Sequence, residues 1–433
     1  MSKPTSSTPR AALAELPALP LHQRPKNVEL KTTPAGVPKV NSNQSLTPPS
    51  TPPKLENSRA PISADAIENR LSIGLTLGLK SLKIIEHEAE QHKTEGEHET
   101  KLKWYNKKYE LHEELGHGVW SNVYRATEHR EATTIPGMLP LSPPTSPTND
   151  SAFSSRRILA IKKPSRRDAH RILENEARIL TYLHSYNEAS SYLVPFYGFD
   201  VAQNSIVLDV VPMSLETYAK SARKRPLATN TMFDPLIGAE TWADLAECLI
   251  RGLAFLHSKG CVHGDIKPAN ILLRLDEKDK MIPLYCDFSS SRVISSVTVP
   301  EDVGEVSAVT ADYTSPELLE LLHKRNDERA IATFASDVFA LAVTLLYAAT
   351  GESPYACARM ELQKLGMAKE GVPLEYARRG EQASRVMEGR AVGKMLEGAL
   401  AKDPEKRLEV EGWRCGVRDV VENWRNGGWL RGG

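Results

Sequence analysis

The sequence lacks the features of several protein classes. Its five cysteines are an odd number and contain no CxxC pair, which argues against a disulfide framework or a zinc site and suits a reducing compartment. Basic and acidic residues number 55 each, so the formal net charge is zero. Bulk electrostatic binding to nucleic acid or to a membrane surface is therefore not expected.

Long apolar runs are also missing. The longest, VFALAVTLLYAA from Val338, is far shorter than the roughly 20 residues of a membrane-spanning helix and is typical of a buried core helix. The N-terminus has no clean hydrophobic segment of the signal-peptide kind. Its Ser/Thr-rich, acid-poor composition faintly resembles a transit peptide, but its prolines oppose the amphipathic helix that such a peptide needs. We expect a cytoplasmic or nuclear protein.

Proline, serine and threonine dominate residues 1–62, where SLTPPSTPPK is a representative stretch. Few large apolar side chains are available for burial there, so ordering would not repay its entropy and a disordered tail is predicted. Residues 63–103 form an N-terminal extension with an ambiguous pattern. Alternation from Leu71 to Leu79 indicates a strand, whereas the wider apolar spacing fits one helical face, and we favour a helix packed outside the main domain.

The pattern changes at residue 104, and residues 104–427 are predicted to form one domain. The first part shows strand patterns at YELHEELGHGVWSNVYRATE, RILAIKKP and SIVLDVV, and one amphipathic helix at DAHRILENEARILTYLH. The second part is helical at TWADLAECLIRGLAFLHSKG, SDVFALAVTLLYAAT, GRAVGKMLEGALAKD and near VRDVVENW. Residues 129–155 are too long for an ordinary loop and are predicted to be a disordered insertion. Two lobes are indicated.

The first lobe carries a pattern suited to binding phosphate. Gly116 and Gly118 lie between two predicted strands, where glycine allows backbone amides to approach phosphate oxygens, although any tight hairpin would look similar. Lys162 ends the apolar strand LAIK and can reach a phosphate held there. Glu176, on the following helix, can fix this lysine by an ion pair. The alternatives are a surface lysine and an exposed glutamate.

The segment CVHGDIKPANILL carries a second set of polar side chains. Asp265 can orient a substrate hydroxyl and accept its proton, and Lys267 can neutralise a transferring phosphate. Asn270 offers an amide oxygen to a metal ion. Asp287, after the apolar strand IPLY, offers a carboxylate to Mg²⁺, which shares its ligand shell with phosphates. Each residue alone could be an ordinary polar loop residue, but together and in this order they predict phosphoryl transfer.

These motifs resemble those of the eukaryotic protein kinase family, over residues 104–427. The resemblance implies an α+β, bilobal fold with a small β-rich N-lobe, a larger α-helical C-lobe, and ATP with Mg²⁺ between them. Two glycines of the family pattern are replaced, by Ser121 in the glycine-rich loop and by Ser289 after Asp287. Neither change removes a group that touches phosphate or metal.

The resemblance also assigns roles to individual residues. It implies catalytic roles for Asp265, Lys267, Lys162 and Glu176. It implies metal ligation by Asn270 and Asp287. It implies contacts with ATP, whose adenine meets a hinge at LDVV, from Gly116, Gly118, Val123, Ala160, Lys162, Leu208, Asp209, Val211 and Leu272. It further implies that Asp337 braces the catalytic loop, which holds Asp265, Lys267 and Asn270, and that Arg407 pairs with Glu317.

Lys267 and Thr310 occupy places typical of serine/threonine kinases, so a protein hydroxyl is the expected substrate. Gly264 replaces an arginine that, in family members that have it, pairs with a phosphate on the activation loop. Because the groups that contact phosphate, metal and the transferred proton are all present, we favour an active kinase. The alternatives are a nucleotide-binding pseudokinase that acts as a scaffold and a small-molecule kinase. Because Gly264 cannot pair with a phosphate, we expect kinase activity not to require phosphorylation of the activation loop.

Overall fold

The computed structural model describes residues 101–129, 156–224, 232–294, 310–323 and 330–425. The predicted tail, the extension up to residue 100 and the predicted insertion from residue 130 to residue 155 lie outside the described residues. Leu102, which the sequence-based boundary assigns to the extension, is buried in the core of the folded domain.

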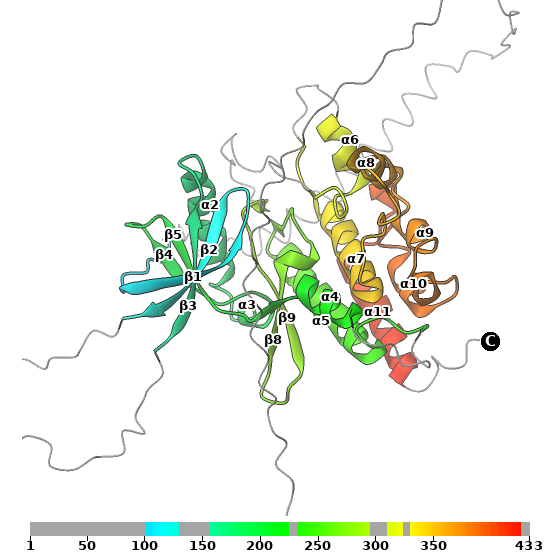
Figure 1. The fold of residues 1–433 in the computed structure, drawn as a ribbon, viewed down its shortest axis with the longest axis horizontal. Coiled ribbons are helices and arrows are strands. Elements are labelled where there is room, and N and C mark those ends of the chain that lie inside the picture. Colours follow the sequence, from blue (N-terminus) through cyan, green and yellow to red (C-terminus); the bar gives the residue numbers. More distant parts are fainter. Residues whose placement is uncertain (1–100, 130–155, 225–231, 295–309, 324–329, 426–433) are drawn as a thin grey trace, which may run out of the picture. The chain divides into compact units, whose positions relative to one another are not determined.

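The first lobe is a five-stranded antiparallel sheet with the order β1-β2-β3-β5-β4 (Figure 1). Its strands are β1 (Tyr109–His117), β2 (Ser121–Glu128), β3 (Ile158–Pro164), β4 (Phe196–Asp200) and β5 (Ser205–Asp209). Helix α2 (Ala169–Leu183) packs against β3, β4 and β5, and the short α3 (Ala189–Tyr192) follows it. Leu173, Ala177 and Leu180 form the buried stripe of α2, at the spacing that the sequence pattern predicts.

The second lobe is built around α7 (Phe334–Thr350), the apolar run of the sequence, which is buried along most of its length. A reciprocal hydrogen-bonded cap between Thr333 and Ser336 begins α7, and Gly351 ends it in the left-handed conformation. Helix α7 contacts α4, α5, α9 and α10. The helices of this lobe are α4 (Leu215–Arg223), α5 (Ala239–Ser258), α6 (Pro316–His323), α7, α8 (Glu361–Glu370), α9 (Pro373–Ala377), α10 (Ala391–Leu396) and α11 (Val410–Arg425).

Two small sheets lie in the second lobe. One has three strands in the order β6-β8-β9, and the other pairs β10 with β7. These strands are β6 (Met213–Ser214), β7 (Cys261–Val262), β8 (Ile271–Leu275), β9 (Met281–Tyr285) and β10 (Arg292–Val293). They hold the loop that connects β7 to β8 and the segment that follows β9, which together carry the polar motifs of the sequence.

Two predicted boundaries, of the helix over residues 389–403 and of the glycine turn, are wrong. The helix predicted over residues 389–403 covers only Ala391–Leu396; Gly393 and Gly398 weaken its helix propensity, and the side chain of Leu408 packs where a Cβ of Gly398 would lie. The last helix, predicted near VRDVVENW, is present as α11 and begins at Val410. Gly116 lies inside β1, paired with Val123, and the turn itself is closed by the Gly118 amide donating to Ser121 O at 2.7 Å.

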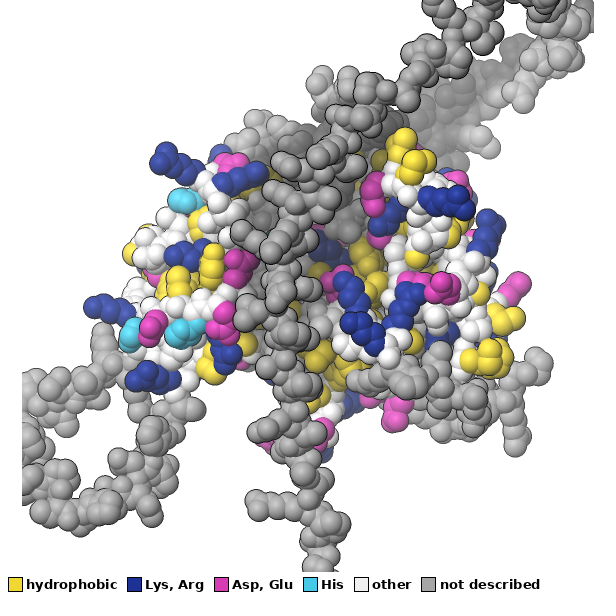
Figure 2. All heavy atoms as spheres, in the orientation of Figure 1, with side chains coloured by type: hydrophobic (Ala, Val, Ile, Leu, Met, Phe, Trp, Pro, Cys, Tyr) yellow, Lys and Arg dark blue, Asp and Glu magenta, His cyan; other side chains and the backbone are white. Residues whose placement is uncertain are grey.

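Among the described residues, no helix combines the length and the apolarity that crossing a bilayer requires. Figure 2 shows Lys and Arg side chains interspersed with Asp and Glu over the visible face of the described residues. On this face of the described residues, positive and negative charges are therefore mixed, and neither sign forms a large patch of its own.

Candidate active site

Lys162 joins three separate parts of the domain. Its Nζ donates to both carboxylate oxygens of Glu176, at 2.8 and 2.7 Å, and to Asp287 Oδ1 at 2.7 Å. The side chains of Lys162 and Glu176 are only 6% and 2% exposed. One ammonium group therefore connects β3, helix α2 and the segment after β9 of the second lobe, and the predicted Lys162–Glu176 pair is present.

Two opposing effects act on the pKa of Lys162. Burial lowers it, because the ammonium loses hydration, but the carboxylates of Asp287 and Glu176 outweigh burial and raise it above its ordinary value. At Asp287, burial raises the pKa, and the ammonium of Lys162 outweighs burial and holds the pKa below its usual range. Lys162 and Asp287 are therefore both charged near neutral pH, as phosphate binding and metal ligation require.

The loop before β8 gathers its polar side chains around Asp265. Lys267 Nζ donates to Asp265 Oδ2 at 2.6 Å and to Thr310 Oγ1 at 3.4 Å. Asn270 Nδ2 donates to the Asp265 carbonyl and to Asp265 Oδ2, at 2.8 and 2.9 Å. Burial raises the pKa of Asp265, and Lys267 opposes this effect. The carboxylate is thus fixed on one side by two donors.

Asp337, on α7, fixes the backbone in front of Asp265. Its Oδ2 accepts from the His263 amide at 2.7 Å, and its Oδ1 accepts from the Gly264 amide at 2.9 Å. Gly264 has a φ of +80°, the left-handed region that favours glycine. A Cβ at this position would collide with the carbonyl oxygen of Ser290. Both the backbone conformation and the close approach of the following segment therefore depend on glycine here.

The segment after Asp287 is anchored by side chains that the sequence interpretation did not assign to the site. Ser291 Oγ donates to the His263 carbonyl at 2.7 Å. Arg292 donates from Nε and Nη2 to the Ala332 carbonyl, at 3.0 and 2.8 Å. No local pattern marks Ser291, because its role depends on how closely the segment approaches Gly264.

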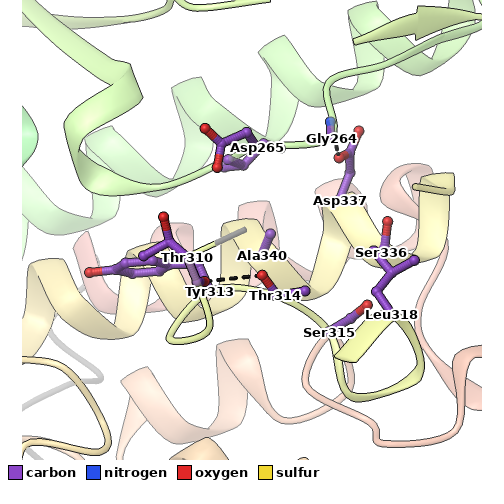
Figure 3. A pocket seen from close by; sticks show the side chains of 11 residues that line it. Gly264, Asp265, Thr310, Tyr313, Thr314, Ser315, Leu318, Ser336, Asp337 and Ala340 are labelled. Carbon is purple, nitrogen blue, oxygen red and sulfur yellow. Dashed lines mark hydrogen bonds between the residues drawn. The ribbon is translucent and has the colours of Figure 1, made fainter. Parts of the chain in front are cut away.

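A small cavity of about 20 Å³ lies between the catalytic loop and the start of α6 (Figure 3). Asp265 and Gly264 lie on one side of it, and the stretch from Thr310 to Ser315 lies on the other. Ser315 Oγ is buried and has no hydrogen-bond partner among the described residues. On the same side of the cavity as Ser315, Thr310 Oγ1 accepts a hydrogen bond from Lys267 Nζ, as the resemblance to serine/threonine kinases implies.

The predicted nucleotide contacts share one face of the five-stranded sheet. Val123 pairs with Lys162 and with Gly116, and Ala160 pairs with Leu208. Paired residues of antiparallel strands point to the same face, and residues two apart on β3 do so as well. These five residues therefore lie on the face of the sheet that carries Lys162.

The remaining predicted contacts lie at the connection between the lobes and beyond it. Asp209 ends β5, and its amide donates to Pro195 O at 3.0 Å. Val211 lies in the short link between β5 and β6, where the chain enters the second lobe. Leu272 lies in β8 of that lobe, paired with Ser214. The residues predicted to contact the nucleotide thus lie in both lobes.

The residues present fit a nucleotide and a hard cation. A Cβ at Gly116 would meet no described atom within 4 Å, so the sheet face is open at that point. Among the described residues, no group of three or more His, Cys, Asp and Glu side chains could hold a metal ion by itself. Asp287 and Asn270 are adjacent because the Cys286 amide donates to Asn270 O at 3.0 Å, and the Asp287 side chain is 36% exposed. Two oxygen ligands of this kind suit Mg²⁺ that shares its shell with phosphates.

A buried ion pair closes the second lobe behind the site. Arg407 donates to both carboxylate oxygens of Glu317, at 2.8 and 3.1 Å, and its side chain is fully buried. It also donates to the Ala335 carbonyl at 2.7 Å. The predicted Arg407–Glu317 pair therefore ties the start of α6 to the segment before α11.

Comparison with known proteins agrees with this geometry. Serine/threonine-protein kinase RUNKEL of Arabidopsis thaliana is 28% identical over 305 residues, which cover 70% of this chain and 18% of the relative. Serine/threonine-protein kinase PKH3 of Eremothecium gossypii is 27% identical over 331 residues, 72% of this chain and 36% of the relative. Mitogen-activated protein kinase kinase 3 of Arabidopsis thaliana is 32% identical over 213 residues, 46% of this chain and 34% of the relative.

The chain therefore spans little more than a third, or less, of the length of these relatives. The family model of the protein kinase domain matches residues 151–415, which is more than half of the chain. With the bilobal fold and the arrangement of Lys162, Asp265 and Asp287, this match shows that the chain belongs to the protein kinase family.

Proposed function

We propose that the chain transfers the γ-phosphoryl group of ATP to serine or threonine hydroxyls of proteins, with Mg²⁺ as the metal ion. The observation that carries this proposal is the contact of Lys162 with Glu176 and Asp287 at the same time. It brings the phosphate-binding side chain of one lobe to the metal-binding side chain of the other. Asp265 completes the set with its carboxylate fixed by Lys267 and Asn270.

The side chains divide the work of phosphoryl transfer between them. Bound magnesium–ATP would supply the transferable group and the positive charge that offsets its phosphate oxygens. Lys162 Nζ, held by Glu176, would bind phosphate oxygens, and Asp287 and Asn270 would hold the cation. Asp265 orients the substrate hydroxyl and accepts its proton, and its raised pKa brings it closer to the operating pH. Lys267 offsets the charge that develops on the transferred group.

The pseudokinase alternative is less well supported. The side chains predicted to contact phosphate, metal and the transferred proton are all present. They form two hydrogen-bonded groups, Lys162 with Glu176 and Asp287, and Asp265 with Lys267 and Asn270. A scaffold would not need Asp265 to be held by two donors. The similar proteins are named as serine/threonine kinases and a MAP kinase kinase, which also supports an active enzyme.

A reducing compartment, the cytoplasm or the nucleus, is part of the same proposal. The five cysteines are free thiols, and burial raises the pKa of the Cys261 thiol and of the Cys286 thiol, which lies beside Asp287. Fluorescence imaging of the tagged full chain tests this placement. Accumulation in a secretory compartment would contradict it.

The direct test is transfer of labelled phosphate from ATP to a generic protein substrate and to the chain itself. We expect Mg²⁺-dependent transfer by the wild type, with label on serine or threonine after acid hydrolysis. Asp287→Asn is the matched control, since it removes one ligand oxygen while keeping the shape of the side chain. Equal transfer by wild type and Asp287→Asn, or no transfer by either, would overturn the proposal.

A further inference from the structure

The chain just before β1 forms an additional edge of the sheet. Residues 101–105, here called the strap, run beside β4, the outermost strand. The Phe199 amide donates to Lys103 O at 2.8 Å, and the Tyr105 amide donates to Phe199 O at 3.0 Å. Trp104 and Phe199 form a parallel bridge. The strap is thus attached to β4 by backbone hydrogen bonds on both sides of Trp104.

Strand β4 is built to accept the strap closely. A Cβ at Gly198 would lie 2.8 Å from the carbonyl carbon and oxygen of Trp104 and 2.9 Å from the amide of Tyr105. These are backbone atoms, which cannot move aside as the end of a flexible side chain can. Only glycine at this position allows the strap and β4 to approach as they do.

The strap also binds the last turn of α2. The Lys103 amide donates to Thr181 Oγ1 at 3.2 Å, and Lys103 Nζ donates to Phe196 O at 2.9 Å. Leu102 is 7% exposed and belongs to the same buried cluster as Leu173 and Leu180 of α2. The strap is therefore connected to the helix by one hydrogen bond, and Leu102 belongs to the same buried core as the helix.

Helix α2 is the element that carries Glu176. Thr181 lies five residues further along the same rigid helix, about 7.5 Å along its axis. Tyr182, the next residue, donates from its hydroxyl to Lys259 O of the second lobe at 3.1 Å. The last turn of α2 is thus hydrogen-bonded both to the strap and to the second lobe. The position of this helix determines the distance between the Glu176 carboxylate and Lys162 Nζ.

We propose that the strap is a positioning element, in which Leu102, Lys103 and Thr181 hold α2 so that Glu176 stays on Lys162. Phosphoryl transfer then depends on the docking of residues 101–105 onto the sheet and α2. A change in the preceding chain that displaces the strap would alter the position of α2 and hence the Lys162–Glu176 pair. This inference deepens the proposed function and rests on it for the effect on transfer, but the effect on α2 does not depend on activity.

The test uses a matched pair of full-length variants at one position. Thr181→Val keeps the size of the side chain but removes the acceptor for the Lys103 amide and the hydroxyl that donates to Ala177 O at 2.7 Å, whereas Thr181→Ser retains both. Leu102→Ala removes the buried side chain of the strap, and Lys101→Ala changes an exposed strap residue as control. Hydrogen exchange of the α2 amides, the melting temperature, and kcat and KM for ATP and for the protein substrate are measured on each.

We expect α2 amides to exchange at least about threefold to tenfold faster in Thr181→Val, since that is the range for one lost hydrogen bond and two are lost, while Thr181→Ser resembles the wild type. Leu102→Ala should increase exchange by about thirtyfold or more, since it removes a buried leucine side chain. The turnover number should fall in the same order, with the KM for the protein substrate unchanged. Lys101→Ala should match the wild type.

Unchanged α2 exchange in Thr181→Val and Leu102→Ala would overturn the inference. An increase spread evenly over both lobes would overturn it too, because it would show that the strap contributes only to overall stability. The two proposals fail separately. Absence of transfer in the wild type rejects the proposed function, whereas the exchange of α2 amides still decides whether the strap holds the helix.

Discussion

The carbonyl oxygen of Ser290 occupies the place that a Cβ of residue 264 would take, so the segment after Asp287 packs directly on the backbone of Gly264. The amide of Gly264 is held by Asp337 at 2.9 Å in a left-handed conformation. Replacement of the family's arginine by glycine is therefore more than the loss of a charge. It allows an approach that any other residue would prevent.

Gly264→Ala should lower the free energy of unfolding by about 1–3 kcal/mol, because a side chain at this φ is strained and displaces Ser290. Gly264→Arg should not raise activity, since its Cβ meets the same carbonyl. Urea unfolding of the two variants and their transfer rates provide the measurements. Gly366→Ala in α8 is the matched control; its Cβ meets no described atom within 4 Å, and it should be neutral or slightly stabilising. A Gly264→Ala variant as stable as the wild type would contradict this account.

Lys162→Met should lower transfer at least ~10²-fold, because it removes the phosphate-binding ammonium and leaves two carboxylates without their shared partner. Glu176→Gln should be milder, since it keeps the side-chain shape and removes only the charge that orients Lys162. Initial rates at saturating ATP, with circular dichroism to verify folding, test both. Activity of a folded Lys162→Met variant close to that of the wild type would show that the lysine has another role.

Asp265→Asn and Asp287→Asn should have different kinetic signatures. Asp265→Asn should lower turnover by ~10²–10⁴-fold, the usual contribution of a positioned general base, with little change in the KM for ATP. Asp287→Asn removes a metal ligand and should also weaken the binding of magnesium–ATP. Titration of nucleotide binding with and without Mg²⁺ separates the two effects, and identical profiles for both variants would show that the assigned roles are wrong.

The sequence predicted those features that depend on local pattern and motif order. The apolar run from Val338 marks α7, and the spacing of Asp265, Lys267 and Asn270 marks the loop whose hydrogen bonds the structure shows. The fold class followed from the resemblance rather than from periodicity. Short strands such as β6 and β7, two residues each, carry no periodic signal of their own, because tertiary pairing defines them.

Other features could not be predicted because they depend on contacts between distant segments. Gly198 is an unremarkable glycine in the sequence, and its role becomes visible only when Trp104 lies against it. The anchoring role of Ser291 likewise depends on the approach of Ser290 to Gly264. Gly393 and Gly398 show the opposite case, in which low helix propensity shortens a helix that apolar periodicity predicted.

Activity should not require phosphorylation of the activation segment, which runs from Asp287 to Glu317. Gly264 has no side chain to pair with a phosphate, while Ser291 and Arg292 already fix the start of the segment through backbone carbonyls. The candidate phosphorylation sites lie outside the described residues and are Ser295, Ser296, Thr298 and Ser307. Acidic neighbours in the same stretch would oppose an added phosphate, and they are Glu301, Asp302 and Glu305.

Simultaneous replacement of the four candidate sites by alanine should leave transfer within about twofold of phosphatase-treated wild type, because Gly264 has no side chain to pair with a phosphate. Ser291→Ala is the informative contrast. It removes a buried hydrogen bond to His263 O and should destabilise the segment by about 1–3 kcal/mol, with a corresponding loss of turnover. Rates of the three proteins, measured at equal folded fraction, decide the matter. A fall of about tenfold or more in the fourfold alanine variant, with Ser291→Ala unaffected, would mean that a phosphate rather than Ser291 orders the segment.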